Sequence, residues 1–395
     1  MEPLETDSAG LNLAFSLTEG GPGTAFMKRL RLIHPELGMG SARTALILMA
    51  LTWLPLAGLC LLEGLAFGRV EIPFFKDIGA QTRFLFAVPV LVLADIPVGI
   101  RLRQVVRHFV TAGLIKKDEL AKFGQILLNA LRLRDSHLGG LIVLVLAYIG
   151  TYNALTGSLQ SGSTWFRPVA GQGLTPAGYW YAVVALPIFQ FLILRWIYRM
   201  VVWTRVLLNV SKLDLQLTPT HPDGAGGLGF LGKGIIPFGV ILFALSAVVA
   251  GGIASRVLFS GSRLEDYQWS YAALFAIALV VFAGPLLIFV PRLLALKQQG
   301  LIQYGTLGSR YTQAFQQRWI EAAAPTEEPL LGSADIQSLA DLGNSFETIR
   351  KMRIVPAELR DFIAMVLPAL IPVLPLAATV MPVGTIIRSL LKLIV

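Results

Sequence analysis

The chain has 395 residues, of which 55% are hydrophobic and 14% are charged. Soluble globular proteins carry roughly 25% charged residues, so the composition excludes that class and predicts a protein embedded in lipid. The formal net charge of +9 would suit nucleic acid, but the basic residues stand beside apolar segments, which favours a role in membrane topology. We therefore expect membrane lipids as partners and no nucleic acid. Cys60 is the single cysteine, which excludes an intrachain disulfide and a cysteine-based zinc site.

Residues 1–42 are predicted to form a polar cytoplasmic tail that ends in a basic segment before the membrane. Residues 1–26 carry several acidic side chains and show neither the basic start nor the short apolar core of a cleavable signal peptide. We interpret residues 1–26 as a mobile tail. The basic residues ahead of the first apolar segment are Lys28, Arg29, Arg31 and Arg43.

Long apolar segments dominate residues 43–290, which we assign to a transmembrane domain. A helix needs roughly 20 apolar residues to cross the hydrocarbon core, where unpaired backbone groups are costly. Six segments meet that length: 44–67, 84–100, 138–155, 179–202, 235–259 and 269–290. The sequence thus predicts an all-α, polytopic membrane protein with six clear transmembrane helices.

The distribution of lysine and arginine predicts the orientation of the chain. Connection 101–137 is rich in both, whereas the connection between the third and fourth segments holds only Arg167. Positive connections face the cytoplasm, so we expect the amino terminus, 101–137 and the turn at 211–234 on the cytoplasmic side of an inner (plasma) membrane. Tyrosine and tryptophan at 179–181 and 267–271 then mark the external interface.

The cytoplasmic connections are expected to be helical. From Asp118 to Arg134, apolar residues recur at spacings of three and four, which is typical of an amphipathic helix and makes 101–137 a helical hairpin. Residues 291–361 form a second cytoplasmic region, with helices expected at 292–320 and 335–353 and a proline-containing linker at 321–332.

Residues 362–395 are assigned to a C-terminal membrane segment, with a seventh helix at 362–387. Four prolines interrupt this apolar run, and each tends to kink a helix because it removes a backbone hydrogen bond. We expect a proline-kinked span packed against protein, and a segment that enters the membrane and returns is the alternative. The prolines are Pro368, Pro372, Pro375 and Pro382.

A glycine-rich turn, THPDGAGGLGFLGKG at 220–234, precedes the fifth apolar segment. It matches two nucleotide-binding patterns, but no strand precedes it, and Gly234 stands where a phosphate loop needs Ser or Thr. Two interpretations remain open: a tight turn that uses the conformational freedom of glycine, or a site for an anion or lipid headgroup at a helix start. The candidate residues of that site are His221, Asp223, Gly226, Gly227 and Lys233.

No other motif predicts catalysis or metal binding. The four histidines show no ligand spacing on one helix, and no serine or cysteine nucleophile stands in a recognisable motif. We therefore assign no catalytic residue, no metal and no cofactor, and an enzyme is the less expected outcome. The histidines are His34, His108, His137 and His221.

Asp95 is an acidic residue within the second apolar segment, where a charge is costly unless it is paired or hydrated. Arg195, with Arg199 one turn further on, lies at a comparable depth in the fourth segment. One interpretation is a cation-attracting or proton-linked site on a polar path, and the other is a structural ion pair that fixes helix packing. The candidate residues of the path are Asp95, Arg195, Gln190 and Asn153.

These features predict a channel or transporter for ions or small solutes, with a polar path near the second to fourth helices. Small-residue pairs such as Gly139 with Gly140 permit close packing between helices of one subunit or of neighbouring subunits, and we expect a homo-oligomer. Two alternatives remain open. One is a membrane-embedded enzyme that binds a lipid or phosphate headgroup at the glycine-rich turn, and the other is a non-catalytic membrane scaffold.

Overall fold

The computed structural model describes residues 15–21, 39–157, 163–168, 173–321 and 334–376, and within these ranges the regular elements are helical. The predicted all-α, multi-pass architecture is confirmed, because seven helical stretches in the described residues are long and apolar enough to cross a membrane. We call them spans 1 to 7: Gly40–Leu62, Ile78–Thr111, His137–Thr156, Pro176–Val210, Phe230–Phe259, Leu264–Glu321 and Leu359–Leu376.

Most spans contain more than one helical element. Span 1 is α2 (Met39–Leu62) and span 3 is α7 (His137–Gly157). Span 2 joins α3 (Ile78–Gln81), α4 (Val88–Leu93) and α5 (Asp95–Thr111), and span 4 joins α8 (Pro176–Trp180) to α9 (Leu186–Val210). Span 5 joins α10 (Phe230–Ile235) to α11 (Gly239–Ser260), span 6 joins α12 (Gln268–Ala278) to α13 (Val290–Phe315), and span 7 begins with α15 (Leu359–Val366).

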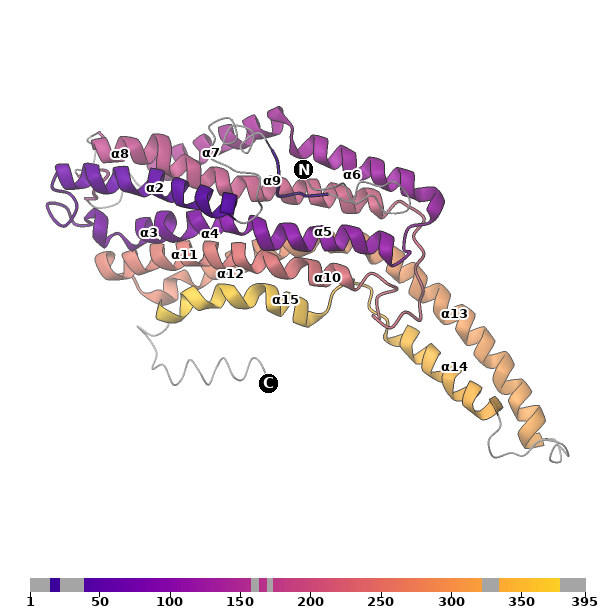
Figure 1. The fold of residues 1–395 in the computed structure, drawn as a ribbon. Helices are drawn as coiled ribbons and strands as arrows, with labels where there is room; N and C mark the ends of the chain where they lie inside the picture. The colour runs from indigo at the N-terminus through magenta and orange to yellow at the C-terminus, as the bar shows by residue number, and fades with distance from the viewer. Residues whose placement is uncertain (1–14, 22–38, 158–162, 169–172, 322–333, 377–395) are drawn as a thin grey trace.

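The bundle is elongated (Figure 1), and its two ends differ in chemistry. At the aromatic end, α3 and α8 begin, and the rings of Phe74, Phe166 and Tyr181 pack around Trp165. At the basic end, α5 continues past its apolar stretch and α6 (Leu120–Arg134) runs beside α9. The predicted amphipathic helix is thus confirmed as α6, which buries Phe123 and Leu127 and exposes its polar face.

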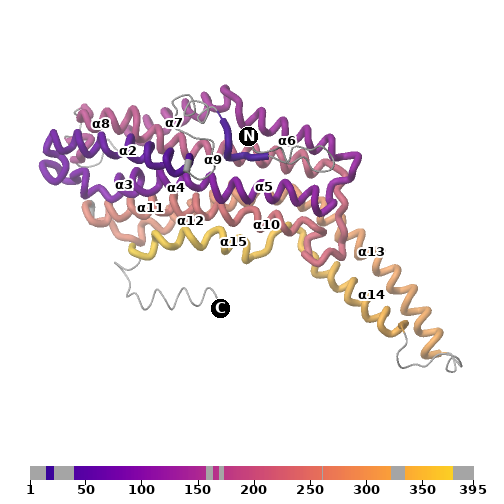
Figure 2. The backbone as a smooth tube through the Cα atoms, viewed as in Figure 1, coloured from indigo at the N-terminus to yellow at the C-terminus, as the bar shows by residue number. Residues whose placement is uncertain are grey.

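The hairpin of α13 and α14 (Ala334–Lys351) projects from the basic end, as the tube in Figure 2 traces. Helices predicted at 292–320 and 335–353 are therefore confirmed. The expected linker between them lies outside the described residues except for Glu321. The hairpin joins the bundle near Gly300, where an added Cβ would press on Pro219 and Ile349.

A local distortion is common to spans 2, 4 and 6. Each contains a π-helical turn that ends two residues before a proline. A proline ring clashes with the carbonyl four residues earlier, and a wider turn relieves that clash. The prolines, Pro89, Pro187 and Pro285, follow at equal intervals along the sequence, and their π-helical turns are Thr82–Ala87, Tyr181–Ala185 and Leu279–Ala283.

Side chains of neighbouring spans satisfy carbonyl oxygens that prolines leave free. The Leu51 carbonyl, four residues before Pro55, accepts a hydrogen bond of 3.2 Å from Trp180 Nε1. The Val183 carbonyl, four residues before the proline of span 4, accepts one of 3.1 Å from the hydroxyl of Tyr148. Since hydrocarbon offers no water to these oxygens, such contacts bind the spans together.

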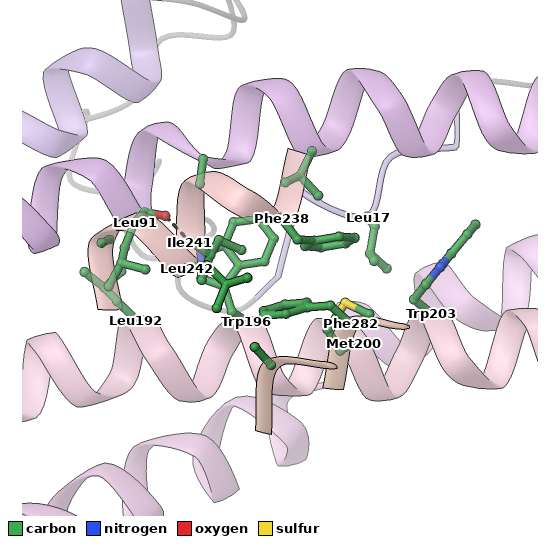
Figure 3. Close-up of a cluster of buried hydrophobic side chains, with 14 of the residues drawn as sticks. Leu17, Leu91, Leu192, Trp196, Met200, Trp203, Phe238, Ile241, Leu242 and Phe282 are labelled. Atoms are coloured by element: carbon green, nitrogen blue, oxygen red, sulfur yellow. Dashed lines mark hydrogen bonds between the residues drawn. The ribbon is translucent and has the colours of Figure 1, made fainter. Parts of the chain in front are cut away.

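The core is built from large apolar side chains of spans 2, 4, 5 and 6 (Figure 3). Trp196 is almost fully buried, and its Nε1 donates a hydrogen bond of 3.0 Å to the Leu91 carbonyl, drawn as a dashed line. Phe238 stacks on Phe282 with ring centroids 4.9 Å apart. Leu17, from the start of the chain, belongs to the same cluster.

Residues 15–21, here called the N-terminal segment, differ from the mobile tail expected for residues 1–26. Phe15, Ser16, Leu17 and Thr18 are all buried. The ring of Phe15 lies 6.5 Å from that of Trp203, centroid to centroid. Two apolar residues in an acidic stretch are enough to anchor the segment, and the rest of the predicted tail lies outside the described residues.

The described part of the C-terminal segment runs to Leu376 and packs along α11. After α15, the chain continues as a 3-10 helix, Leu367–Val373, that contains two of the expected prolines. The Ser246 hydroxyl donates a hydrogen bond of 2.6 Å to the Ala369 carbonyl in this stretch. The predicted packing against protein is thus confirmed as far as Leu376, and the remainder of 362–387 lies outside the described residues.

Candidate functional site

Three charged side chains meet inside the bundle, where spans 2 and 4 pack together. Asp95 is the first residue of α5, and Arg195 and Arg199 stand one turn apart on α9. Asp95 Oδ1 accepts hydrogen bonds from Arg199 Nη1 at 2.5 Å and from Arg195 Nη2 at 3.2 Å. The predicted pair of Asp95 and Arg195 is therefore present, and Arg199 is a second partner. We call these three residues the charge cluster.

Arg199 is buried, Asp95 and Arg195 are partly buried, and the charge of the cluster is unbalanced. The exposed fraction of the side chain is 3% for Arg199, 16% for Asp95 and 18% for Arg195. The Arg199 guanidinium also lies over the ring of Trp196, 4.9 Å from its centroid, where the ring face stabilises a cation. One carboxylate facing two guanidinium groups leaves an excess of positive charge. That sign is opposite to the cation-attracting site expected from Asp95 alone.

The N-terminal segment covers one side of the charge cluster. Arg199 Nη2 donates a hydrogen bond of 2.7 Å to the Thr18 carbonyl. Gly99, one turn after Asp95 on α5, leaves space for this approach, because a Cβ at Gly99 would collide with the Thr18 hydroxyl. Sequence reasoning missed the contact, since four buried residues are too few to reveal a periodic pattern.

Arg83 is a further cation in span 2 that sequence reasoning missed. It lies in the π-helical turn, and its Nη1 donates a hydrogen bond of 2.8 Å to the Tyr181 hydroxyl in the π-helical turn of span 4. Its guanidinium carbon lies 5.9 Å and 5.6 Å from the ring centroids of Phe84 and Phe189. The two distorted turns thus meet at this bond. The available signal was an arginine directly before the segment predicted to begin at residue 84.

The other two residues of the expected path lie apart from the charge cluster. Gln190 faces α7, where its Oε1 accepts a hydrogen bond of 3.4 Å from the Thr151 hydroxyl and packs on Gly150. Asn153 is exposed on α7. The structure therefore brings together Asp95 and Arg195 and separates them from Gln190 and Asn153.

The glycine-rich turn is organised by the carboxylate of Asp223. Asp223 Oδ1 accepts hydrogen bonds from the amides of Ala225 at 2.8 Å and Gly227 at 3.1 Å, and Oδ2 accepts one from Gly229 at 2.8 Å. His221 Nδ1 lies 2.9 Å from Oδ1. Burial raises the pKa of Asp223, but the three amides and His221 lower it more strongly, so the pKa lies below its ordinary value.

Backbone conformation explains why glycine is needed at two positions of the turn. Gly226 and Gly227 have φ angles of +65° and +99°, a region that other residues rarely adopt. A Cβ at Gly226 would also press on Leu296 of the hairpin, and one at Gly227 would press on Leu114. The predicted role of glycine in a tight turn is thus confirmed.

The same turn joins the projecting hairpin to the bundle. The Arg353 amide donates to the Gly224 carbonyl at 2.8 Å, and Arg353 Nη2 donates to the Asp223 carbonyl at 2.5 Å. Lys233 is exposed on α10, and its carbonyl accepts a hydrogen bond of 3.1 Å from Arg101 Nε. The amide of Gly227, a candidate donor to an external anion, is bonded to Asp223. Headgroup binding at the turn stays a prediction.

Among the described residues, no three or more His, Cys, Asp and Glu side chains are grouped so that they could hold a metal ion. Comparison of the chain with protein families, with curated proteins and with solved structures gives no match. The membrane domain is a polytopic helical bundle with a charge cluster between spans 2 and 4.

Proposed function

We propose that this protein is a membrane channel or transporter whose charged solute meets the charge cluster. The observation that carries the proposal is the cluster itself, in which Asp95 faces both Arg195 and Arg199 within two membrane spans. A charge inside a bilayer is costly, and charged side chains within membrane spans commonly mark the paths of ions or substrates.

One turn beyond Arg199 on α9, around the buried Trp203, the bundle is tightly packed. A core cavity lined by Trp203, Phe238 and Phe282 measures about 10 Å³, the space of about one water molecule. Solute passage along this interior therefore requires a change of conformation, which favours a transporter or a gated channel over an open pore. The π-helical turns of spans 2, 4 and 6 are the natural positions for such a change, because their hydrogen bonding is already irregular.

A homo-oligomer in an inner membrane, with the basic end toward the cytoplasm, remains part of this proposal. Its support is the outer face of α7, because α7 packs mainly against α9 and its other side exposes apolar and aromatic side chains. The exposed side chains are Leu144, Val145, Tyr148, Ile149 and Tyr152. The mass of the protein in nanodiscs tests the oligomer, and a monomer would remove that part of the proposal.

The test of function is ion uptake by liposomes that contain the purified protein. We expect uptake of sodium, potassium, chloride or inorganic phosphate above that of protein-free liposomes. Two variants change the charge of the cluster in opposite directions. Asp95→Asn removes its negative charge, whereas Arg195→Gln leaves one carboxylate with one guanidinium. Each should change the uptake rate by about tenfold, which corresponds to roughly 1.4 kcal/mol of barrier.

The matched control is Asp214→Asn, which removes an aspartate paired with Lys116 at the exposed basic end. This variant should keep the wild-type rate, because the pair lies at the surface and outside the spans. Absence of uptake for all four ions would contradict a channel or transporter of simple ions. Uptake that neither cluster variant changes would remove the charge cluster from the path.

A further inference from the structure

The carbonyl of Thr18 occupies a position that an anionic oxygen would fill better. It accepts a hydrogen bond from Arg199 Nη2 at 2.7 Å, beside the carboxylate of Asp95. A peptide carbonyl carries only a partial negative charge, so it accepts the hydrogen bond without neutralising the charge of the guanidinium. Hydrogen bonds from guanidinium to carboxylate or phosphate are roughly twice as strong as neutral ones. The cluster therefore has one more cation than its own residues can balance.

Arg195 gives a second indication that the cluster lacks a negatively charged partner. Its Nη2 bonds to Asp95 at 3.2 Å, whereas its Nε is buried and makes no hydrogen bond within the described residues. A buried donor without a partner is costly, and such groups call for a ligand or water that completes them. Arg195 and Arg199 lie one turn apart on α9, so one small oxyanion can reach both guanidinium groups.

The N-terminal segment is held by contacts that can be broken without unfolding a helix. Its residues are not part of a helix, and its polar contacts are with side chains of α5, α6 and α9 and with the residue after α6. Glu19 pairs with Arg103 at 2.9 Å, the Gly21 amide donates to Asp135 at 2.7 Å, and Arg134 donates to the Ser16 carbonyl. Apart from these bonds, Phe15 and Leu17 anchor the segment in the core.

We propose that Arg195 and Arg199 form a binding site for a small oxyanion, a carboxylate or a phosphate, and that the N-terminal segment and the anion compete for it. With the segment in place, the Thr18 carbonyl covers Arg199. When the anion binds, it takes over the guanidinium donors and the segment leaves its position beside α5 and α9. The inference rests on the proposed function only in supplying the solute class, and its test measures binding instead of flux.

The test follows the accessibility of one introduced cysteine. Ser16→Cys is made in a Cys60→Ala background, which removes the single native thiol. Ser16 is buried in the structure, so in maltoside detergent without phospholipid the introduced thiol should react slowly with a maleimide. Inorganic phosphate or acetate should raise the labelling rate by about fivefold or more, as expected when a ligand shifts a two-state equilibrium. Potassium chloride at equal ionic strength should have no such effect.

A parallel sample receives phosphatidylglycerol instead of a free anion. A rise in labelling with this lipid alone assigns the oxyanion to a lipid headgroup, and a rise with phosphate or acetate assigns it to a free solute. Either result supports the site provided that Arg195→Gln abolishes it. A response that persists in Arg195→Gln, or the absence of any response to the three probes, overturns the proposal.

A second variant displaces the segment without any ligand. Gly99→Ala places a methyl group against the Thr18 hydroxyl and should speed labelling of Ser16→Cys, and adding Thr18→Gly should restore slow labelling. Gly58→Ala is the control, because a Cβ at Gly58 meets no atom within 4 Å. If Gly99→Ala fails to fold, Leu17→Asp displaces the segment from its own side. Slow labelling in both displaced variants overturns the competition.

Discussion

Asp95 and Asp223 are both partly buried aspartates, and they are satisfied in opposite ways. Asp223 is bonded by amides two to six residues further along its own turn. Asp95 is bonded by guanidinium groups of another span, about a hundred residues away in the chain. Three nearby amides satisfy the single carboxylate of Asp223, and the turn forms a self-contained structural unit. The two guanidinium groups carry more positive charge than the Asp95 carboxylate can balance, and this excess of charge is the basis for proposing a charged solute.

The largest expected effect comes from removing the carboxylate of the charge cluster. Asp95→Ala leaves two buried guanidinium groups without a counter-charge, which should lower the free energy of unfolding by about 3–5 kcal/mol. Titration with denaturing detergent, followed by circular dichroism, measures it. Adding Arg195→Met should recover part of the loss. If Asp95→Ala were no more destabilising than Asp214→Ala at the surface, the contrast between the two aspartates would disappear.

A smaller and more local effect is expected at the turn. Asp223→Ala leaves the amides of Ala225, Gly227 and Gly229 without their acceptor, at a cost of about 1–3 kcal/mol. Hydrogen exchange should become faster at these amides and at the hairpin junction, while the amides of α11 keep their wild-type rates. Faster exchange throughout the bundle would show that the turn is not a separate unit.

Two features of the spans could be predicted from the sequence. Apolar length located the spans, and equal depth predicted that Asp95 would pair with Arg195. The contact of Thr18 with Arg199 could not be predicted, because it joins residues far apart in sequence through a backbone carbonyl that has no sequence signature.

The glycine-rich turn was predicted only in part. Its glycines were recognised, but their amides were considered as donors to an external anion. Asp223 stands two residues before the first of the bonded amides, and an aspartate at that position commonly binds the amides that follow it. That rule, applied to the sequence, would have assigned the amides to Asp223.

Acid should weaken the glycine-rich turn. The pKa of Asp223 lies below its ordinary value, so the carboxylate stabilises the turn above about pH 4 and loses this contribution as the pH falls through the lowered pKa. Limited digestion by pepsin between pH 4 and 2 should therefore cut residues 211–229 increasingly fast. Asp223→Asn should remove this pH dependence, and a wild-type profile in that variant would assign it to another group.

The most direct test of the central claim is the ratio of phosphate to sodium uptake in liposomes, compared between the wild type and Arg195→Gln. An excess of positive charge at the cluster predicts that the wild type favours the anion. Removing that excess should lower the ratio by about tenfold, equivalent to roughly 1.4 kcal/mol of differential barrier. A ratio that stays unchanged in Arg195→Gln would mean that the charge cluster holds the spans together and does not meet the solute.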